Sequence, residues 1–481
     1  MLKRYFGPQI HQRVHFFVLA LFIVGVVCSK FLMSMGLLLG VLNLLLEGNF
    51  RSYAQRLREN QLILLVVFFY VLHLFGLIWT SNWEYGLDDI RKKTSLLLIP
   101  IIIGAHPIPS LKSWTRLIHF FILTLLVTAI INFLSYHFFA EKLHLIDIRD
   151  MSLFGSHIRY GILLGIGLAF CLERIYQGAK YRNGYLFSAI FFLIYSFYSQ
   201  VLSGLIAVSI VLIGLLVFIL VMRKQYLILA SSFLLVILSS LGLCYYLSQP
   251  IIYPTPCVEQ YNQIESAWNE RSPLNYDSLD KRKQPVASTL ERYLSSKGLC
   301  ANTEGVQKLT DKDIQFIETG FADVHETYGG IQARLLDIRY QLHHASNPSG
   351  HSILERIEYW KNAWAIIENH FLIGVGTGDV NDEMQKMYDQ RHSSLTEERR
   401  LRAHNSYLTY YLTFGIFGFG FFLYFQFKFI IQQWKWKQWI GFLFGIIALV
   451  TFLFEDTLES QMGITMFALF YAVFSRKITS K

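Results

Sequence analysis

Residues 202–221 read LSGLIAVSIVLIGLLVFILV, a run of 20 residues without a charged side chain. A second run, YLILASSFLLVILSSLGLCYYL at 226–247, begins after only four intervening residues. A helix of about 20 apolar residues spans the hydrocarbon core of a bilayer. A helix at the surface of a soluble protein has a polar face, which neither run can provide. The two runs therefore predict two consecutive membrane-spanning helices.

Similar runs recur along most of the chain. Of its 481 residues, 53% are hydrophobic and only 16% are charged, whereas about 25% of residues are charged in soluble domains. We therefore predict an all-α integral membrane protein with about twelve transmembrane helices. The spans are expected near residues 14–29, 31–47, 62–79, 94–105, 115–137, 153–172, 184–199, 202–221, 226–247, 406–427, 439–455 and 460–475.

One long polar stretch interrupts these runs and divides the chain into three predicted domains. Residues 1–247 would form an N-terminal bundle of about nine transmembrane helices. Residues 248–405 would form a large, mostly helical domain outside the membrane. Residues 406–481 would return to the membrane as about three C-terminal helices.

The basic residues indicate how the chain is oriented. With the N-terminus in the cytoplasm, the inner segments carry 19 Lys and Arg residues and the short outer segments carry 6, as the positive-inside rule requires. We therefore expect a multi-pass membrane protein with both termini cytoplasmic and the large loop outside, which in a bacterial inner (cytoplasmic) membrane means the periplasm. Orientation accounts for most of the net charge of +9, so we expect membrane lipids and no nucleic acid as partners.

Two of the five cysteines, Cys257 and Cys300, lie in the polar stretch. In an oxidising compartment such a pair is a candidate disulfide. The alternative is two unrelated free thiols, since pairing requires proximity in space.

A charged residue lies within one predicted span, in GSHIRY at 155–160. Arg159 is about six residues from the outer end of that span, roughly 9 Å below the surface. It could extend its side chain to the interface. We favour the alternative, in which its planar guanidinium binds a phosphate at headgroup depth, with His157 as a neighbouring substrate-binding residue.

A histidine stands where the polar stretch re-enters the membrane, in AHNSYL at 403–408. An imidazole exchanges a proton near neutral pH, which makes His404 a candidate catalytic residue and Asn405 and Tyr407 candidate substrate-binding residues. A lone interfacial histidine is more often structural. The expected position of His404 on the same membrane side as Arg159 favours the catalytic interpretation.

Two further charged residues are expected at this face. Arg356 lies on a predicted helix that starts near Ser352, and by itself would be an ordinary solvated charge. Glu459 precedes the last span and could orient an arginine or a histidine, although a simple charged loop explains it equally well. No residues have the spacing of a zinc site or a nucleotide loop, so we predict neither a metal nor a cofactor.

In their order and spacing, these motifs resemble the O-antigen ligase and O-antigen polymerase family of bacterial inner-membrane glycosyltransferases. His404 is followed after ten residues by Gly415, like the histidine motif of the family, and Arg159 and Leu163 fit its Arg-x-x-x-Leu motif. Arg356 in RIEYW resembles the conserved arginine segment of the large periplasmic loop. The run E-x-x-x-E-S-Q-M-G at 455–463 is also similar.

One motif departs from the family pattern. Many relatives carry a Ser-Arg-Gly turn between the seventh and eighth spans, whereas this chain has Ser203-Gly204 without the arginine. The phosphate contact could come instead from Arg91 or Lys92, which we include among the candidate substrate-binding residues, or from Lys93.

The resemblance implies a GT-C-like architecture and an inverting, metal-independent glycosyltransferase. The donor would be a glycan linked to undecaprenyl pyrophosphate, and the acceptor a hydroxyl of another glycan or of the lipid A core. Arg159 and Arg356 would stabilise the charge of the leaving pyrophosphate, and His404 would accept the proton of the acceptor hydroxyl. We favour an O-antigen ligase that acts on lipid A core.

Other functions stay open at this level. Within the family, an O-antigen polymerase or a protein O-oligosaccharyltransferase would share the fold and the donor. From other classes, a multi-pass transporter or flippase would also use charged residues within the membrane, although the two matching halves of many transporters are not seen. A non-catalytic partner in envelope assembly would tolerate substitution of His404.

Overall fold

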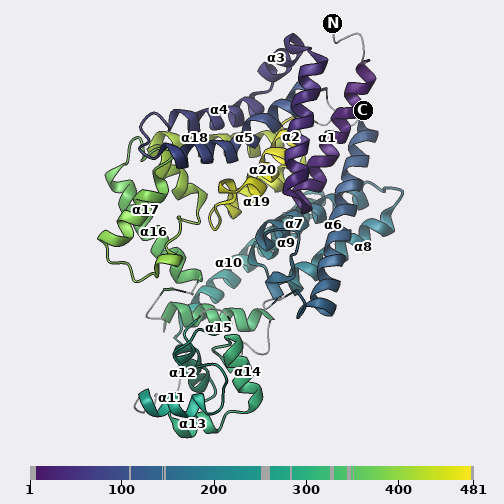
Figure 1. Cartoon of the computed structure of the whole chain (residues 1–481). Helices are drawn as coiled ribbons and strands as arrows, with labels where there is room; N and C mark the ends of the chain where they lie inside the picture. The colour runs from purple at the N-terminus through teal and green to yellow at the C-terminus, as the bar shows by residue number, and fades with distance from the viewer. Residues whose placement is uncertain are drawn as a thin grey trace. The chain divides into compact units, whose positions relative to one another are not determined.

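The structure, a computed structural model, describes residues 7–107, 110–143, 145, 148–250, 261–281, 284–324, 330–343, 348–349 and 352–477. These residues form helices and no β-strands (Figure 1), which confirms the predicted all-α class. The helices are α1 (Pro8–Cys28), α2 (Lys30–Glu47), α3 (Phe50–Glu59), α4 (Gln61–Phe75), α5 (Trp83–Ala105), α6 (Leu111–Phe139), η2 (Ile148–Met151), α7 (His157–Tyr176), α8 (Arg182–Tyr198), α9 (Leu202–Met222), α10 (Tyr226–Ser248), α11 (Tyr261–Asn269), α12 (Val286–Ser296), α13 (Thr303–Gln307), α14 (Asp311–Thr319), α15 (Gly330–His343), α16 (Ser352–Asn369), α17 (Val380–Gln390), η4 (Glu397–Arg399), α18 (Ser406–Trp436), α19 (Trp439–Thr451), η5 (Thr457–Glu459) and α20 (Gln461–Phe474).

Several of these helices have the length and composition of membrane spans. Within the described part of the chain, six are long and apolar enough to cross a membrane: α1, α2, α6, α9, α10 and α18. The pair α3 and α4 also passes when taken together, but its axis bends by 97°. The other predicted spans fall on shorter or more polar helices such as α19 and α20. The count of twelve spans therefore stays a prediction.

The chain divides into two compact units. Unit 1 contains Met1–Met222, Tyr359–His392 and Leu401–Lys481, and unit 2 contains Arg223–Glu358 and Ser393–Arg400. These boundaries differ from the three predicted domains, because α10 groups with unit 2 and residues 359–392 group with unit 1. The predicted domains concern membrane topology, which these units leave untested.

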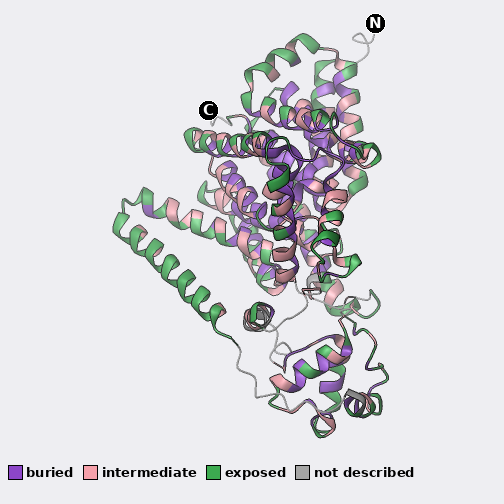
Figure 2. Cartoon of the chain, turned by 90° about the vertical axis from the view of Figure 1, so that its left-hand side faces the viewer, coloured by how far each residue is buried: buried purple, intermediate pink, exposed green. Residues whose placement is uncertain are grey.

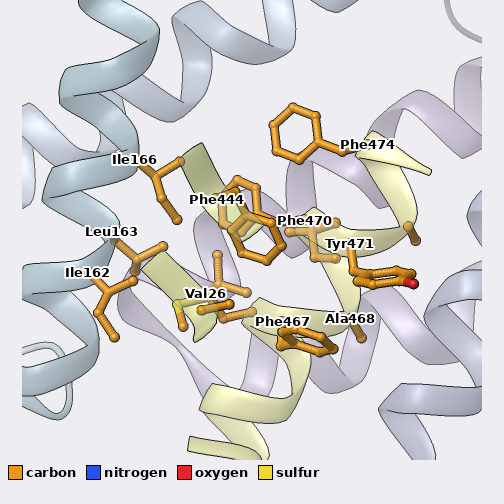
Figure 3. Packing of buried hydrophobic residues seen from close by; sticks show 14 of the residues in the cluster. Val26, Ile162, Leu163, Ile166, Phe444, Phe467, Ala468, Phe470, Tyr471 and Phe474 are labelled. Carbon is orange, nitrogen blue, oxygen red and sulfur yellow. The ribbon is translucent and has the colours of Figure 1, made fainter. Parts of the chain in front are cut away.

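Unit 1 has a large core in which aromatic side chains are prominent. Residues of α7, α19 and α20 meet there, as Figure 3 shows for Leu163, Phe444 and Phe470. The rings of Phe444 and Phe470 lie 5.6 Å apart between centroids. By contrast, α10 buries no residue, and it is green along its length in Figure 2. An apolar helix without a buried face is typical of one that contacts lipid.

A glycine bends the longest helix, α18. Gly415 has φ +63° and ψ −163°, which interrupts the helical backbone. At this break, α18 exchanges hydrogen bonds with residues 371–376: the Val375 N–H donates to the Leu412 carbonyl at 2.8 Å, and the Ile416 N–H to the Phe371 carbonyl at 2.9 Å. Gly415 ends the His-x₁₀-Gly motif. A glycine is required there because the backbones of α18 and residues 371–376 approach closely.

Replacing Gly415 by alanine is expected to destabilise unit 1 strongly. An alanine Cβ would lie 2.2 Å from the Leu372 carbonyl oxygen, and the backbone conformation alone costs a non-glycine residue about 1–3 kcal/mol. Thermal unfolding of purified protein in detergent should show a lower midpoint. Gly420→Ala is the control, because no atom lies within 4 Å of a Cβ at this position of α18. Equal midpoints for the two variants would contradict this account.

Unit 2 contains a small helical core of its own. Trp268, Tyr276 and Tyr293 are fully buried there, in a cluster formed by residues 264–317. Thr310 and Asp313 form a capping box at the start of α14. Cys300 is disulfide-bonded, and its predicted partner Cys257 lies outside the described residues.

The carboxylate of Asp313 makes the stability of this core depend on pH. Burial opposes ionisation of Asp313, but hydrogen bonds from Lys297, Thr310 and Tyr293 lower its pKa well below the usual range. The Asp313 carboxylate therefore binds a proton more tightly in the unfolded state than in the folded state. The stabilisation is therefore complete above the unfolded pKa of about 3.9 and is lost as the pH falls below it.

Lys297→Met should consequently lower the unfolding midpoint at neutral pH, and the difference from the unchanged protein should shrink at about pH 3. Differential scanning fluorimetry across this pH range measures both effects. Lys308→Met is the matched control, since Lys308 pairs with Glu304 on the surface, where the two side chains are 57% and 70% exposed. A difference that does not depend on pH would exclude Asp313 as the responsible group.

Candidate active site

Unit 1 contains all but one of the predicted catalytic and substrate-binding residues. They occupy loops and helix ends that are far apart in the sequence: His157 and Arg159 on the first turn of α7, Arg91 and Lys92 on α5, His404, Asn405 and Tyr407 at the start of α18, and Glu459 in η5. Arg356 belongs to unit 2, on the first turns of α16.

His404 has an unusual backbone conformation. Its φ of +47° is in the left-handed region, which non-glycine residues rarely adopt. The backbone N–H donates to Asp456 Oδ2 at 3.0 Å, and the neighbouring Ala403 carbonyl accepts from Trp360 Nε1 at 2.9 Å. Strain of this kind persists where the surroundings hold a residue in place, often at a functional site.

The imidazole ring of His404 packs near Tyr359, and one of its nitrogens has no hydrogen bond among the described residues. Its ring lies 5.7 Å from that of Tyr359, between centroids. The Nδ1 atom is buried and has no hydrogen-bond partner among the residues that the structure describes. A buried polar atom without a partner costs free energy. The Nδ1 atom of His404 is therefore a candidate hydrogen-bond partner for a polar group that is absent from the described residues.

Asp456 links the His404 turn to α18. Its Oδ1 accepts from Thr409 Oγ1 at 2.9 Å, while its Oδ2 accepts from the His404 N–H. Ser406 Oγ donates to the Glu455 carbonyl at 2.8 Å, so a second bond joins the same two loops. Asp456 was not among the predicted site residues, because nothing in the sequence pairs it with His404.

Asn405 and Tyr407, which were predicted to bind substrate, both make hydrogen bonds within the protein. The Asn405 side chain caps α18 by accepting from the N–H groups of Tyr407 and Leu408, at 3.0 and 3.2 Å. The Tyr407 hydroxyl donates to the Leu449 carbonyl at 2.8 Å. Their contact with a substrate stays a prediction.

Glu459 lies in a buried network of charges. Its Oε2 accepts from Lys93 Nζ at 2.9 Å and from Arg402 at 2.8 Å. Lys93 also pairs with Asp89 at 2.6 Å, and the Tyr410 hydroxyl donates to Glu459 Oε1 at 3.3 Å. Burial by itself would raise the pKa of Glu459, but Arg402 and Lys93 lower it to about 2. Glu459 is therefore placed to orient Arg402, and its contact with a substrate stays a prediction.

This network includes two cations, of which Lys93 was named only as an alternative phosphate contact and Arg402 was not predicted. Lys93 and Arg402 are almost entirely buried, with side chains 2% and 16% exposed. The spacing of Asp89 and Lys93, four residues apart on one helix, was a usable signal for a pair. Arg402 offered no such signal, because its partner Glu459 is 57 residues away.

The adjacent cations Arg91 and Lys92 lie in a different environment from Lys93. Both pair with Asp88, at 2.6 Å each, and their side chains are 78% and 40% exposed. In an α-helix, consecutive residues point in different directions, which separates these two from the buried network. Their proposed contact with phosphate stays a prediction.

Arg159 lies close to the loop that carries Asp456 and Glu459. It is half-buried, makes no hydrogen bond or ion pair within the described part of the chain, and interacts electrostatically with Glu455. A Cβ on the nearby Gly155 would lie 2.9 Å from Met462 Cε, so the start of α7 packs against the start of α20. Arg159 therefore retains a guanidinium without a hydrogen bond among the described residues, near Glu455.

The Ser203-Gly204 turn, which lacks the arginine of many relatives, packs against the start of α7. Ser203 Oγ donates to the Ile158 carbonyl at 2.9 Å, and a Cβ on Gly161 would lie 2.7 Å from Gly204 Cα. His157 lines a small cavity together with Tyr160, Tyr195 and Val201. In unit 2, Arg356 donates to the Ser352 carbonyl at 3.0 Å, within its own helix.

One protein family matches the sequence. The family model described as O-Antigen ligase matches residues 187–423, a segment that includes Arg356, His404 and Gly415. The match confirms the resemblance to the O-antigen ligase and polymerase family, and it indicates a membrane enzyme with ligase- or polymerase-type glycosyltransferase activity. No curated protein matches the sequence.

Proposed function

We propose, from this relation to the O-antigen ligases, that the protein transfers a glycan from an undecaprenyl-pyrophosphate carrier to an acceptor hydroxyl. The reaction takes place at the periplasmic face of the inner membrane, with both termini in the cytoplasm. The acceptor is a sugar of the lipid A core, which makes the protein a ligase. The observation that carries the proposal is the strained His404 turn, whose buried Nδ1 has no partner among the described residues.

The chemistry is a single displacement at the anomeric carbon. The acceptor oxygen forms a bond to this carbon as the bond to the pyrophosphate oxygen breaks, and the electron pair leaves with the lipid pyrophosphate. His404 accepts the proton of the attacking hydroxyl. Because attack and departure occur on opposite faces, the anomeric configuration inverts. The step needs no metal ion.

The two arginines act on the leaving group. Negative charge grows on the pyrophosphate as the glycosidic bond breaks, and guanidinium groups stabilise it most in the transition state. Arg159 supports this role, because its guanidinium is half-buried and lacks a protein hydrogen bond within the described residues. Arg356 is assigned to the same role by its motif in the matched segment.

Purified protein in proteoliposomes, supplied with a lipid-linked glycan and lipid A core, should form the coupled product. Arg159→Ala and Arg356→Ala should each reduce the rate about 100-fold or more, the usual effect of removing one charge-stabilising donor. Full activity of both variants would refute the mechanism. A product only with a second lipid-linked glycan would identify a polymerase, and one with a Ser/Thr peptide a protein glycosyltransferase. Lipid movement without a new glycosidic bond would replace the proposal by a flippase.

A further inference from the structure

A second cluster of cations lies at the opposite end of the helices that carry the candidate active site. Asp89 and Lys93 are the seventh and eleventh of the 23 residues of α5, whereas its last residue is Ala105. Similarly, α20 follows Glu459 directly and ends at Phe474, just before Arg476. The twelve residues from Lys93 to Ala105 rise about 18 Å along the helix axis. The second cluster is therefore distinct from the site around His404.

Two arginines meet at the C-terminal end of α5. Arg476 donates to the carbonyls of Gly104 and His106, and Arg56 donates to the Ala105 carbonyl. They satisfy carbonyl groups that lack partners at a helix end. The carbonyls carry no net charge, however, and neither arginine has a carboxylate partner in the part of the chain that the structure describes. Burial, and then repulsion by Arg56, lowers the pKa of Arg476 to about 10.

These arginines line an open pocket with a strong excess of positive charge. Lys428 and Lys477 line the same pocket, which has about 970 Å³ of empty space including its mouth. Glu59 is the one acidic residue among those that line it, and its carboxylate accepts a hydrogen bond from Gln55 at 3.0 Å. Four cations around one carboxylate are electrostatically complementary to an anion with several oxygens.

An apolar cavity adjoins this basic pocket. Arg476 and Pro107 line both, and the remaining walls of the apolar cavity are largely aromatic and aliphatic, with about 820 Å³ of empty space including the mouth. The aromatic walls are Trp114, Phe121, Phe170 and Phe470. His15 also lines it, is 7% exposed, and has a buried Nδ1 without a hydrogen-bond partner among the described residues.

A basic pocket next to an apolar cavity suits a molecule with an anionic group at one end and an apolar chain at the other. We propose that the pocket and the cavity bind an anionic phospholipid, with its phosphate headgroup among Arg56, Arg476, Lys428 and Lys477 and part of an acyl chain in the apolar cavity. The phosphate neutralises two arginines that otherwise repel each other at the end of α5. The acyl chain covers aromatic surface that the bundle itself leaves open. This site is independent of the proposed glycosyl transfer.

The test is native mass spectrometry of the full-length protein with phosphatidylglycerol or phosphatidylethanolamine of identical acyl chains. Phosphatidylglycerol should be retained preferentially. Lys428→Gln with Lys477→Gln should weaken its binding about 25-fold, since each basic residue near an anionic lipid contributes roughly fivefold. Neither lysine donates to the carbonyls at the end of α5, so folding should be preserved.

Lys435→Gln with Lys437→Gln is the matched control, because these exposed lysines remove the same charge without lining either cavity. This control should bind phosphatidylglycerol like the unchanged protein, and a short-chain phosphatidylglycerol should bind at least tenfold more weakly than the long-chain lipid. Equal retention of the two headgroups, or equal loss in the two double variants, would overturn the proposal. Displacement by inorganic phosphate at the concentration at which the lipid binds would also overturn it, in favour of a simple anion site.

Discussion

Replacing His404 by asparagine should reduce the rate of glycan transfer between 100- and 10,000-fold, the range typical for loss of a general base. Asparagine is the informative replacement because it adopts a positive φ more readily than most residues. The backbone N–H can therefore still donate to Asp456. The amide side chain cannot accept a proton as an imidazole does. The variant thus removes the proposed chemistry while retaining the turn.

The control for this variant is His392→Asn. His392 also has a positive φ, +48°, but it is exposed and ends the segment 359–392 of unit 1. The two variants should have unfolding midpoints close to that of the unchanged protein, and only His404→Asn should lose activity. If His404→Asn transferred glycan at the unchanged rate, His404 would have a structural role and the assignment of the base would be wrong.

The second large effect is expected at Lys93. Lys93→Met should lower the stability of unit 1 by about 3–5 kcal/mol, because it leaves buried carboxylates without their cation. Asp89 loses its partner at 2.6 Å, and Glu459 keeps only Arg402 as a cationic partner. Chemical or thermal unfolding in detergent measures the loss. Activity should fall as well, since Glu459 and Asp456 occupy the same short loop.

Lys92→Met is a control one residue away. Its ion pair with Asp88 is exposed, and exposed pairs contribute about 0–1 kcal/mol. A double variant, Lys93→Met with Asp89→Leu, should recover part of the lost stability, because it removes one of the uncompensated charges together with the cation. Similar stability of Lys92→Met and Lys93→Met would show that the buried network contributes little.

Part of the candidate site was accessible from sequence. Arg159 was chosen as a charge within a predicted span and His404 as a histidine at the predicted interface, and their spacing, with Gly415, carried the family resemblance. The family match confirms that resemblance over residues 187–423, a segment that includes His404 and Gly415 but not Arg159. The sequence does not show why residue 415 has to be a glycine. The reason depends on residues 371–376 approaching α18 closely enough to hydrogen-bond at the break, and this approach is a property of packing.

Other assignments depended on the direction in which a side chain points. The sequence does not distinguish Arg91, Lys92 and Lys93. The first two were predicted to bind substrate, with Lys93 as a further alternative. In the structure, Lys93 is buried against Glu459 while the other two pair with Asp88 at the surface. One residue along a helix rotates the side chain by about 100°, and only the position of the neighbouring helices shows which direction is buried.

The sequence by itself determined the helical membrane class and the family relation, because uninterrupted apolar runs and motif spacing are properties of the chain read in order. The tertiary structure alone decided which charges meet. Lys93 and Glu459 are 366 positions apart, and His404 depends on Asp456 for its backbone contact. Such pairs form only when helices pack, since burial makes an uncompensated charge costly and so selects the partner that lies within reach.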